Sequence, residues 1–247
     1  MEFCSQLDRS TLELSVFSKG SISFSRCSYL KGLAYLKFDE VKNIDIFDYD
    51  YVDNFCKKSS TLCSVKCNQL SKKFENIKIG ISKKCNFNCY HCFNKDHFDD
   101  PQTKDIYFFI LNKVKGHQLN GHILGHQREI FNYYDEIINY LSNLSQDDFK
   151  QIIFQTNLSL LNEERIKELK DISLKTNIDY IFLPSINGIT NETFKAITRN
   201  DCFDLVINNL KLLLNLFTSN NVKVTFTIKE LNIDDLPNVN NLFKYIL

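Results

Sequence analysis

The sequence lacks the features that mark membrane and secreted proteins. Its longest apolar run, residues 212–217, is far shorter than the about 20 residues that a helix needs to cross a bilayer. The N-terminus has no basic start followed by an apolar stretch, so it does not resemble a secretion signal. We therefore expect a cytoplasmic protein with no membrane partner.

The chain also lacks a charge excess and a dinucleotide fingerprint. Lys and Arg number 30 and Asp and Glu number 30, which gives a net charge of zero and a pI of about 6.9. Without a basic run there is no phosphate-binding face, so we expect no nucleic-acid partner. No Gly-x-Gly-x-x-Gly follows any strand-like segment, which leaves a dinucleotide-binding fold without support.

Cysteine, by contrast, is abundant and unevenly placed. Eight of the nine cysteines lie in the first 92 residues, and only Cys202 lies beyond them. In a reducing compartment such cysteines are ligands, reactive thiols or buried residues more often than disulfides. The asymmetry predicts two parts, a small Cys-containing module over residues 1–75 and a regular domain over residues 76–247.

The N-terminal module carries four cysteines that could form a metal site. Residues 12–17, 21–25 and 33–38 alternate as strands do. Four thiols hold either a zinc ion or an iron–sulfur cluster. The alternative is a set of buried free cysteines, because the spacing is loose. The residues concerned are Cys27, Cys56, Cys63 and Cys67.

From residue 77 onward, strand-like and helix-like segments alternate. Strands are predicted at 77–82, 121–125, 151–157, 180–183 and 222–228, with helices at 105–115, 131–144, 162–172, 190–199, 203–217 and 236–246. Such repeats predict an α/β fold with parallel strands, either an open sheet or a partial barrel. In a barrel, the loops after the strands gather at one rim, where the chemistry takes place.

The loop after the first strand carries three cysteines. Cys85, Cys89 and Cys92 are spaced C-x3-C-x2-C. A structural zinc ion takes four protein ligands, of which His91 or His97 could supply the fourth. A 4Fe–4S cluster held by three cysteines keeps one iron open for an external molecule. The spacing leaves both metals open, whereas the position at a strand end favours the cluster.

These residues resemble the radical S-adenosylmethionine (radical SAM) superfamily. The C-x3-C-x2-C motif follows the first strand, and residues 125–128, Gly-His-Gln-Arg, stand where the family shows Gly-Gly-Glu-Pro. Residues 156–158, Thr-Asn-Leu, resemble Thr-Asn-Gly, and residues 185–188, Ser-Ile-Asn-Gly, resemble Ser-x-Asp-Gly. The resemblance spans about residues 77–246. It implies a partial TIM-like (β/α) barrel, here with the last repeat lacking.

The resemblance also implies roles for individual residues. The three cysteines would bind the 4Fe–4S cluster, and the open iron would take S-adenosylmethionine. Gln127 would accept a hydrogen bond in place of the family's carboxylate. The other residues expected to contact S-adenosylmethionine are His91, Gly125, His126, Asn157, Ser185, Asn187 and Arg199.

The implied function is a radical SAM enzyme. One electron, delivered by a reductant such as flavodoxin or ferredoxin, would cleave S-adenosylmethionine to a 5′-deoxyadenosyl radical that abstracts hydrogen from a substrate. The Cys-bearing N-terminal part is similar to peptide- and protein-modifying members, which suggests a peptide or protein substrate. The alternative is a non-catalytic zinc or iron–sulfur protein whose altered Gly-His-Gln-Arg no longer holds the cosubstrate.

Overall fold

A computed structural model describes residues 11–16, 21–25, 36–43, 45, 47–48, 75–80, 85–92, 101–125 and 128–246. Two groups of predicted site residues lie outside these ranges. They are the four N-terminal cysteines proposed as a second metal site, and His126 with Gln127.

Four parallel strands form the centre of a seven-stranded sheet. They are β4 (Asn76–Gly80), β5 (Leu119–Leu124), β6 (Phe149–Thr156) and β7 (Asp179–Pro184), adjacent in that order. Along β6 and β7, fully buried residues alternate with half-buried ones. Successive side chains point to opposite faces of a strand, so one face is completely covered and the other borders open space. The predicted α/β fold with a partial barrel of parallel strands is confirmed.

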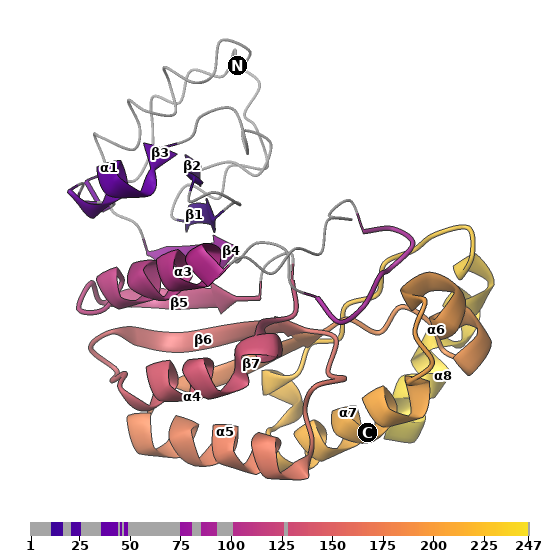
Figure 1. The fold of residues 1–247 in the computed structure, drawn as a ribbon. Helices are drawn as coiled ribbons and strands as arrows, with labels where there is room; N and C mark the ends of the chain where they lie inside the picture. The colour runs from indigo at the N-terminus through magenta and orange to yellow at the C-terminus, as the bar shows by residue number, and fades with distance from the viewer. Residues whose placement is uncertain are drawn as a thin grey trace, which may run out of the picture.

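Three N-terminal strands continue the same sheet beyond β4. Strand β1 (Thr11–Val16) is parallel to β4, and it pairs antiparallel with β2 (Ser21–Ser25), which in turn pairs with β3 (Leu36–Lys37). The short helix α1 (Phe38–Lys42) follows. The sheet is therefore continuous from β3 to β7, and these strands extend it at the edge opposite β7 (Figure 1). The division into two domains stays a prediction.

Helices α3 (Pro101–Lys113), α4 (Tyr134–Ser142) and α5 (Glu163–Thr176) lie along the sheet, whereas α6 (Asn191–Thr198) and α8 (Leu236–Ile246) lie beyond the carboxyl ends of its strands (Figure 1). Side-chain caps fix the starts of two helices, since the Asn162 side chain accepts from Arg165 N and the Thr190 side chain accepts from Thr193 N. None of the described helices is long and apolar enough to cross a membrane. The remaining elements are η3 (Ile130–Tyr133), α7 (Phe203–Leu216), η4 (Ser219–Asn221) and η5 (Ile233–Asp235).

Stacked aromatic rings hold the sheet to its helices. Phe154 on β6 is fully buried and stacks on Phe131 at 5.7 Å and on Phe182 at 5.1 Å between ring centroids. Truncating a buried phenylalanine to alanine typically costs about 3–5 kcal/mol. The carboxyl ends of β6 and β7 therefore lie next to a closely packed aromatic core, which holds the loops that follow them in position.

The prediction of a strand over residues 222–228 was wrong in extent. This segment makes only two isolated parallel bridges to the chain around β7, Phe182 with Val222 and Ser185 with Thr225. Beyond Thr225, side chains replace the ladder, because Thr227 N donates to the Asn187 amide oxygen and Thr227 O accepts from Asn232 Nδ2. After α8 no further strand follows within the described residues.

Candidate active site

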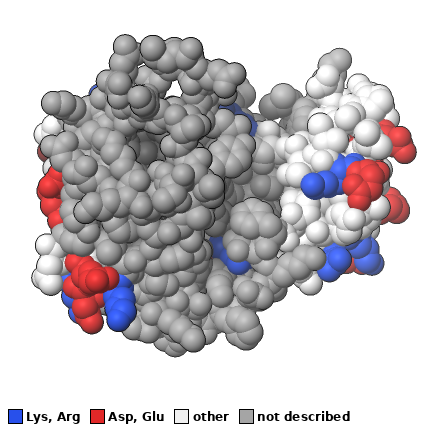
Figure 2. All heavy atoms as spheres, turned by 90° about the horizontal axis from the view of Figure 1, so that it is seen from above, with Lys and Arg blue, Asp and Glu red and all other residues white. Residues whose placement is uncertain are grey.

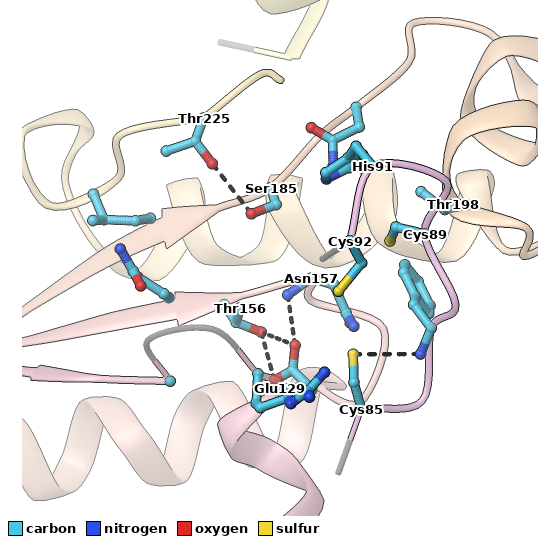
Figure 3. Close-up of a pocket in the computed structure, with 16 residues that line it drawn as sticks. Cys85, Cys89, His91, Cys92, Glu129, Thr156, Asn157, Ser185, Thr198 and Thr225 are labelled. Carbon is cyan, nitrogen blue, oxygen red and sulfur yellow. Dashed lines mark hydrogen bonds between the residues drawn. The ribbon is translucent and has the colours of Figure 1, made fainter. Parts of the chain in front are cut away.

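A cavity of about 280 Å³ lies at the carboxyl ends of β5, β6 and β7. The loop of residues 85–92, called the cysteine loop below, forms one wall (Figure 3). Gly125 and Glu129 follow β5, Thr156 and Asn157 close β6, and Ser185 follows β7; all five line the cavity. The predicted gathering of strand-end residues at one rim is therefore observed.

The three thiols share this cavity without converging on one point. Cys85, Cys89 and Cys92 are each half-buried, and all three line the cavity (Figure 3). Among the described residues, no group of three or more His, Cys, Asp or Glu side chains is arranged to hold a metal ion. A zinc ion needs all its thiolate ligands about 2.3 Å from a single centre. A 4Fe–4S cluster takes each thiolate on a different iron, so this arrangement fits the cluster better.

Burial favours the protonated form of the Cys85 and Cys89 thiols. Burial first, and then the neighbouring thiols Cys85 and Cys92, together raise the pKa of Cys89 to about 12. The pKa of Cys85 is also raised, chiefly by burial, although a hydrogen bond from Phe87 N opposes this. Three adjacent thiolates in a half-buried loop therefore require a compensating positive charge, which iron ions provide when they bind.

The cysteine loop is tied to the scaffold on the side of α6. Tyr90 N donates to Ile197 O at 2.7 Å. The buried ring of Phe87 packs edge-on against Phe194, with 6.1 Å between ring centroids. At the open rim, Tyr90 Oη donates to Glu230 Oε1 at 2.8 Å. These contacts fix a loop that has no regular secondary structure of its own.

Glu129 is a site residue that the sequence analysis missed. It is 1% exposed and accepts hydrogen bonds from Thr156 Oγ1 at 2.9 Å and from Asn157 N at 2.6 Å (Figure 3). Burial raises its pKa to about 7, although these donors oppose the shift. The cavity therefore contains a carboxyl group only two residues beyond Gln127, where the motif comparison expected an amide. A search for any acidic residue within a few positions of the motif would have found it.

Gly125 and Leu158 have the backbone geometry that the motif comparison implies. Gly125 has φ of +78°, and a Cβ on it would lie 2.2 Å from the Gln155 carbonyl oxygen, so only glycine fits. Leu158, at the position of the family's third-strand glycine, is fully buried with φ of +64°. A bulky residue in this left-handed region is uncommon. Its conformation is the one that glycine adopts most easily, which supports the alignment of residues 156–158.

Ser185 and Asn187 form the wall of the cavity after β7. The Ser185 hydroxyl lies 3.2 Å from Thr225 Oγ1 (Figure 3), and Asn187 is 4% exposed. The amide oxygen of Asn187 accepts from Thr227 N, which leaves its Nδ2 as the group facing a ligand. Asn232 secures this wall because its Nδ2 donates to Asn187 O at 2.9 Å.

His91 and Arg199 occupy different places. His91 lines the cavity, and its Nδ1 is buried without a hydrogen-bond partner among the described residues. Arg199 does not line the cavity. It is exposed, has φ of +56° at the end of α6, and its charge weakly opposes the rise in the pKa of Cys89. A direct contact from Arg199 to a ligand in the cavity therefore has less geometric support than one from His91.

A comparison with protein families decides between the two interpretations of this site, a zinc site and an iron–sulfur cluster site. The family model described as the Radical SAM superfamily matches residues 79–243, which is more than half of the chain. The chain belongs to the radical SAM superfamily. This assignment confirms the expected enzyme class and its two cofactors, the 4Fe–4S cluster and S-adenosylmethionine, at the level of the family. The roles of individual site residues stay predictions.

Curated relatives share part of this radical SAM chain. An uncharacterised protein of Methanocaldococcus jannaschii is 28% identical over 158 residues, which are 60% of this chain and 48% of the relative. A probable GTP 3′,8-cyclase of the same organism is 26% identical over 69% of this chain and 55% of its own length. A GTP 3′,8-cyclase of Clostridium perfringens is 27% identical over 69% and 52%. The chain thus spans about half the length of the curated relatives it matches.

The described residues on the face seen in Figure 2 carry charges of both signs, since Lys and Arg side chains and Asp and Glu side chains are both present there.

Proposed function

We propose that this chain is a catalytic radical SAM domain that cleaves S-adenosylmethionine reductively and passes the radical to a substrate. One observation carries the proposal: three half-buried thiols and a buried carboxyl group line the same cavity at the strand ends. When bound, the cluster supplies the electron for cleavage, and S-adenosylmethionine supplies the radical that takes hydrogen from the substrate. The chain's own residues bind, orient and shield these two groups.

Glu129 is proposed to take the role that the motif comparison gave to Gln127. An ionised carboxylate offers about four acceptor sites, and the described donors are Phe131 N, Asn157 N and Thr156 Oγ1. One site remains for the amino group of the cosubstrate. An adjacent cation favours the ionised form of a carboxyl group, so binding would lower the pKa that burial has raised to about 7.

The wall of the cavity after β7 is proposed to bind the nucleoside part of S-adenosylmethionine. The Ser185 hydroxyl and the Asn187 Nδ2 group are suited to ribose hydroxyls. The buried Nδ1 of His91 lacks a partner within the described part of the chain. A purine would satisfy this atom, which otherwise costs about 1–3 kcal/mol of desolvation.

The substrate is not assigned by these residues. By their names, two relatives act on GTP, but this chain covers only about half of each. The comparisons give a peptide or protein substrate no support. We therefore propose the cofactor chemistry alone and treat peptide and nucleotide substrates as separate arms of the experiment.

Anaerobic reconstitution tests the proposal. The purified chain is loaded with iron and sulfide, reduced with dithionite and given S-adenosylmethionine, with and without GTP or a peptide mixture. We expect broad absorbance near 400 nm and formation of 5′-deoxyadenosine, both lost in Cys89→Ala. A protein that binds zinc instead, or a cluster-loaded protein that forms no 5′-deoxyadenosine, would show a non-catalytic metal protein.

A further inference from the structure

Three polar side chains close a hydrogen-bonded ring between the cysteine loop and the end of β6. Asn86 Nδ2 donates to Ser159 Oγ at 2.6 Å, and Ser159 Oγ donates to Asn157 Oδ1 at 2.7 Å. Asn157 Nδ2 returns a hydrogen bond to Asn86 Oδ1 at 2.9 Å. Each amide donates once and accepts once within this Asn86 ring, so the orientation of both amides is fixed.

The β6 side of the ring is rigid. Ser159 N donates to Asn157 Oδ1 at 2.9 Å. From helix α7, the buried Asn209 donates its Nδ2 to Leu158 O at 2.9 Å and to Leu161 O at 2.8 Å. The turn that carries Ser159 is therefore held by the sheet and by a helix. The ring ties the cysteine loop to this scaffold.

On the other side, Asn86 lies between a predicted cluster ligand and the amide that bonds to it. Phe87 N donates to Cys85 Sγ at 3.5 Å (Figure 3). The direction of this N–H group relative to the sulfur depends on the torsions of Cys85 and on the backbone torsions of Asn86, because these two residues join the sulfur to the amide. The buried Phe87 ring fixes one end of this short turn, and the Asn86 ring fixes the other.

The ring is better suited to setting geometry than to adding stability. Asn86 is exposed, and Asn157 is 9% exposed. A hydrogen bond that competes with water contributes little net stability. Loss of Asn86 should therefore leave the fold intact. This separates its effect on the cysteine loop from an effect on the whole protein.

We infer that Asn86, acting through its ring with Asn157 and Ser159, is a positioning residue that aims the Phe87 amide at the Cys85 sulfur. The inference rests on the proposed function, since it assumes that Cys85 holds the cluster. Hydrogen bonds to cysteine sulfurs raise the reduction potential of an iron–sulfur cluster, because they stabilise its more negative, reduced form. Substitution of a residue that orients a metal ligand typically lowers the affinity for the metal 10–100-fold.

The test compares Asn86→Ala and Ser159→Ala with Asn221→Ala in the reconstituted full chain. Asn221 is a matched control that bridges a loop and a strand, since its Nδ2 donates to Tyr180 O at 3.0 Å. The readouts are the midpoint potential of the cluster and the rate of iron release to a chelator. In both ring variants we expect a lower potential and iron release faster by about tenfold, with Asn221→Ala like the wild type. The double variant should match the single ones, because either change opens the ring.

Two results would overturn the inference. If the ring variants keep the potential and the iron release of Asn221→Ala, or if the two single effects simply add, Asn86 does not position Cys85. The proposed function then stands, since the cluster still forms. If the wild type takes up no cluster, both the inference and the proposed function fail. Circular dichroism checks the fold of each variant, and Ser159→Ala carries the test alone if Asn86→Ala does not fold.

Discussion

The buried histidine of β5 makes the stability of this fold depend on pH. His122 is fully buried, its Nδ1 lies 3.4 Å from the Tyr140 hydroxyl, and no residue in the described part of the chain is a hydrogen-bond partner of its Nε2. Burial lowers its pKa to about 3, against about 6.5 in an unfolded chain. The folded protein thus keeps His122 neutral between pH 3 and 6.5, while the unfolded chain binds a proton there. Stability must therefore fall as the pH drops below 6.5.

The size of this effect follows from the two pKa values. At pH 7.5 both states carry a neutral imidazole and the contribution is close to zero. At pH 5, which is about 1.5 units below the pKa of a histidine in the unfolded chain, proton binding stabilises the unfolded chain by about 2 kcal/mol. His122→Leu removes the titrating group at similar volume. We expect the free energy of unfolding of the wild type to fall by about 2 kcal/mol more than that of the variant between these pH values.

Urea unfolding of the cluster-free protein at pH 5, 6 and 7.5 measures this difference. Far-UV circular dichroism is the suitable probe, because the chain has no tryptophan. The wild type and His122→Leu should differ in the slope of stability against pH below 6.5. Equal slopes would refute the reasoning, since they would mean that the buried imidazole titrates as it does in the unfolded chain.

Three further changes give separate tests. Gly125→Ala should destabilise the protein by more than the about 1–2 kcal/mol of left-handed backbone strain, because its Cβ would meet a carbonyl oxygen at 2.2 Å. Gly116→Ala is the control, since Gly116 has φ of +80° but open space around it, and equal urea midpoints for the two would contradict the clash. Asn232→Ala leaves two backbone carbonyls without its donor and should cost about 1–3 kcal/mol in urea unfolding; a loss below that range would mean that water replaces the side chain. Cys89→Ala should abolish iron binding after reconstitution while Cys202→Ala keeps it, and iron counting that finds the two alike would remove the cysteine loop from the site.

The sequence predicted the strand ends well because their signals are local. An apolar run, Ile152 to Phe154, marks β6, and a cysteine loop or small polar residues mark the turns at the rim. The structure shows side-chain caps at Asn162 and Thr190, where two of the predicted helices begin. The local sequence pattern is enough in these cases, because apolar residues repeat with the period of the strand or helix and so mark the face that it buries.

Other features depend on contacts that no local pattern reveals. Glu129 belongs to the site because its burial and its bonds to Thr156 and Asn157 bring it there. Residues 222–228 alternate like a strand, yet the Asn187 and Asn232 side chains take the hydrogen bonds of Thr227 that a longer ladder would use. The Asn86 ring joins positions 73 residues apart, and only the folded chain shows it.

Electron paramagnetic resonance of the reduced, reconstituted protein tests the central claim most directly. Three cysteine ligands leave one iron open to the cosubstrate, so the signal of the reduced cluster should change when S-adenosylmethionine is added. Cys85→Ala should remove the signal altogether. A signal that S-adenosylmethionine leaves unchanged, or the absence of any iron–sulfur signal from the wild type, would contradict the assignment of this cavity.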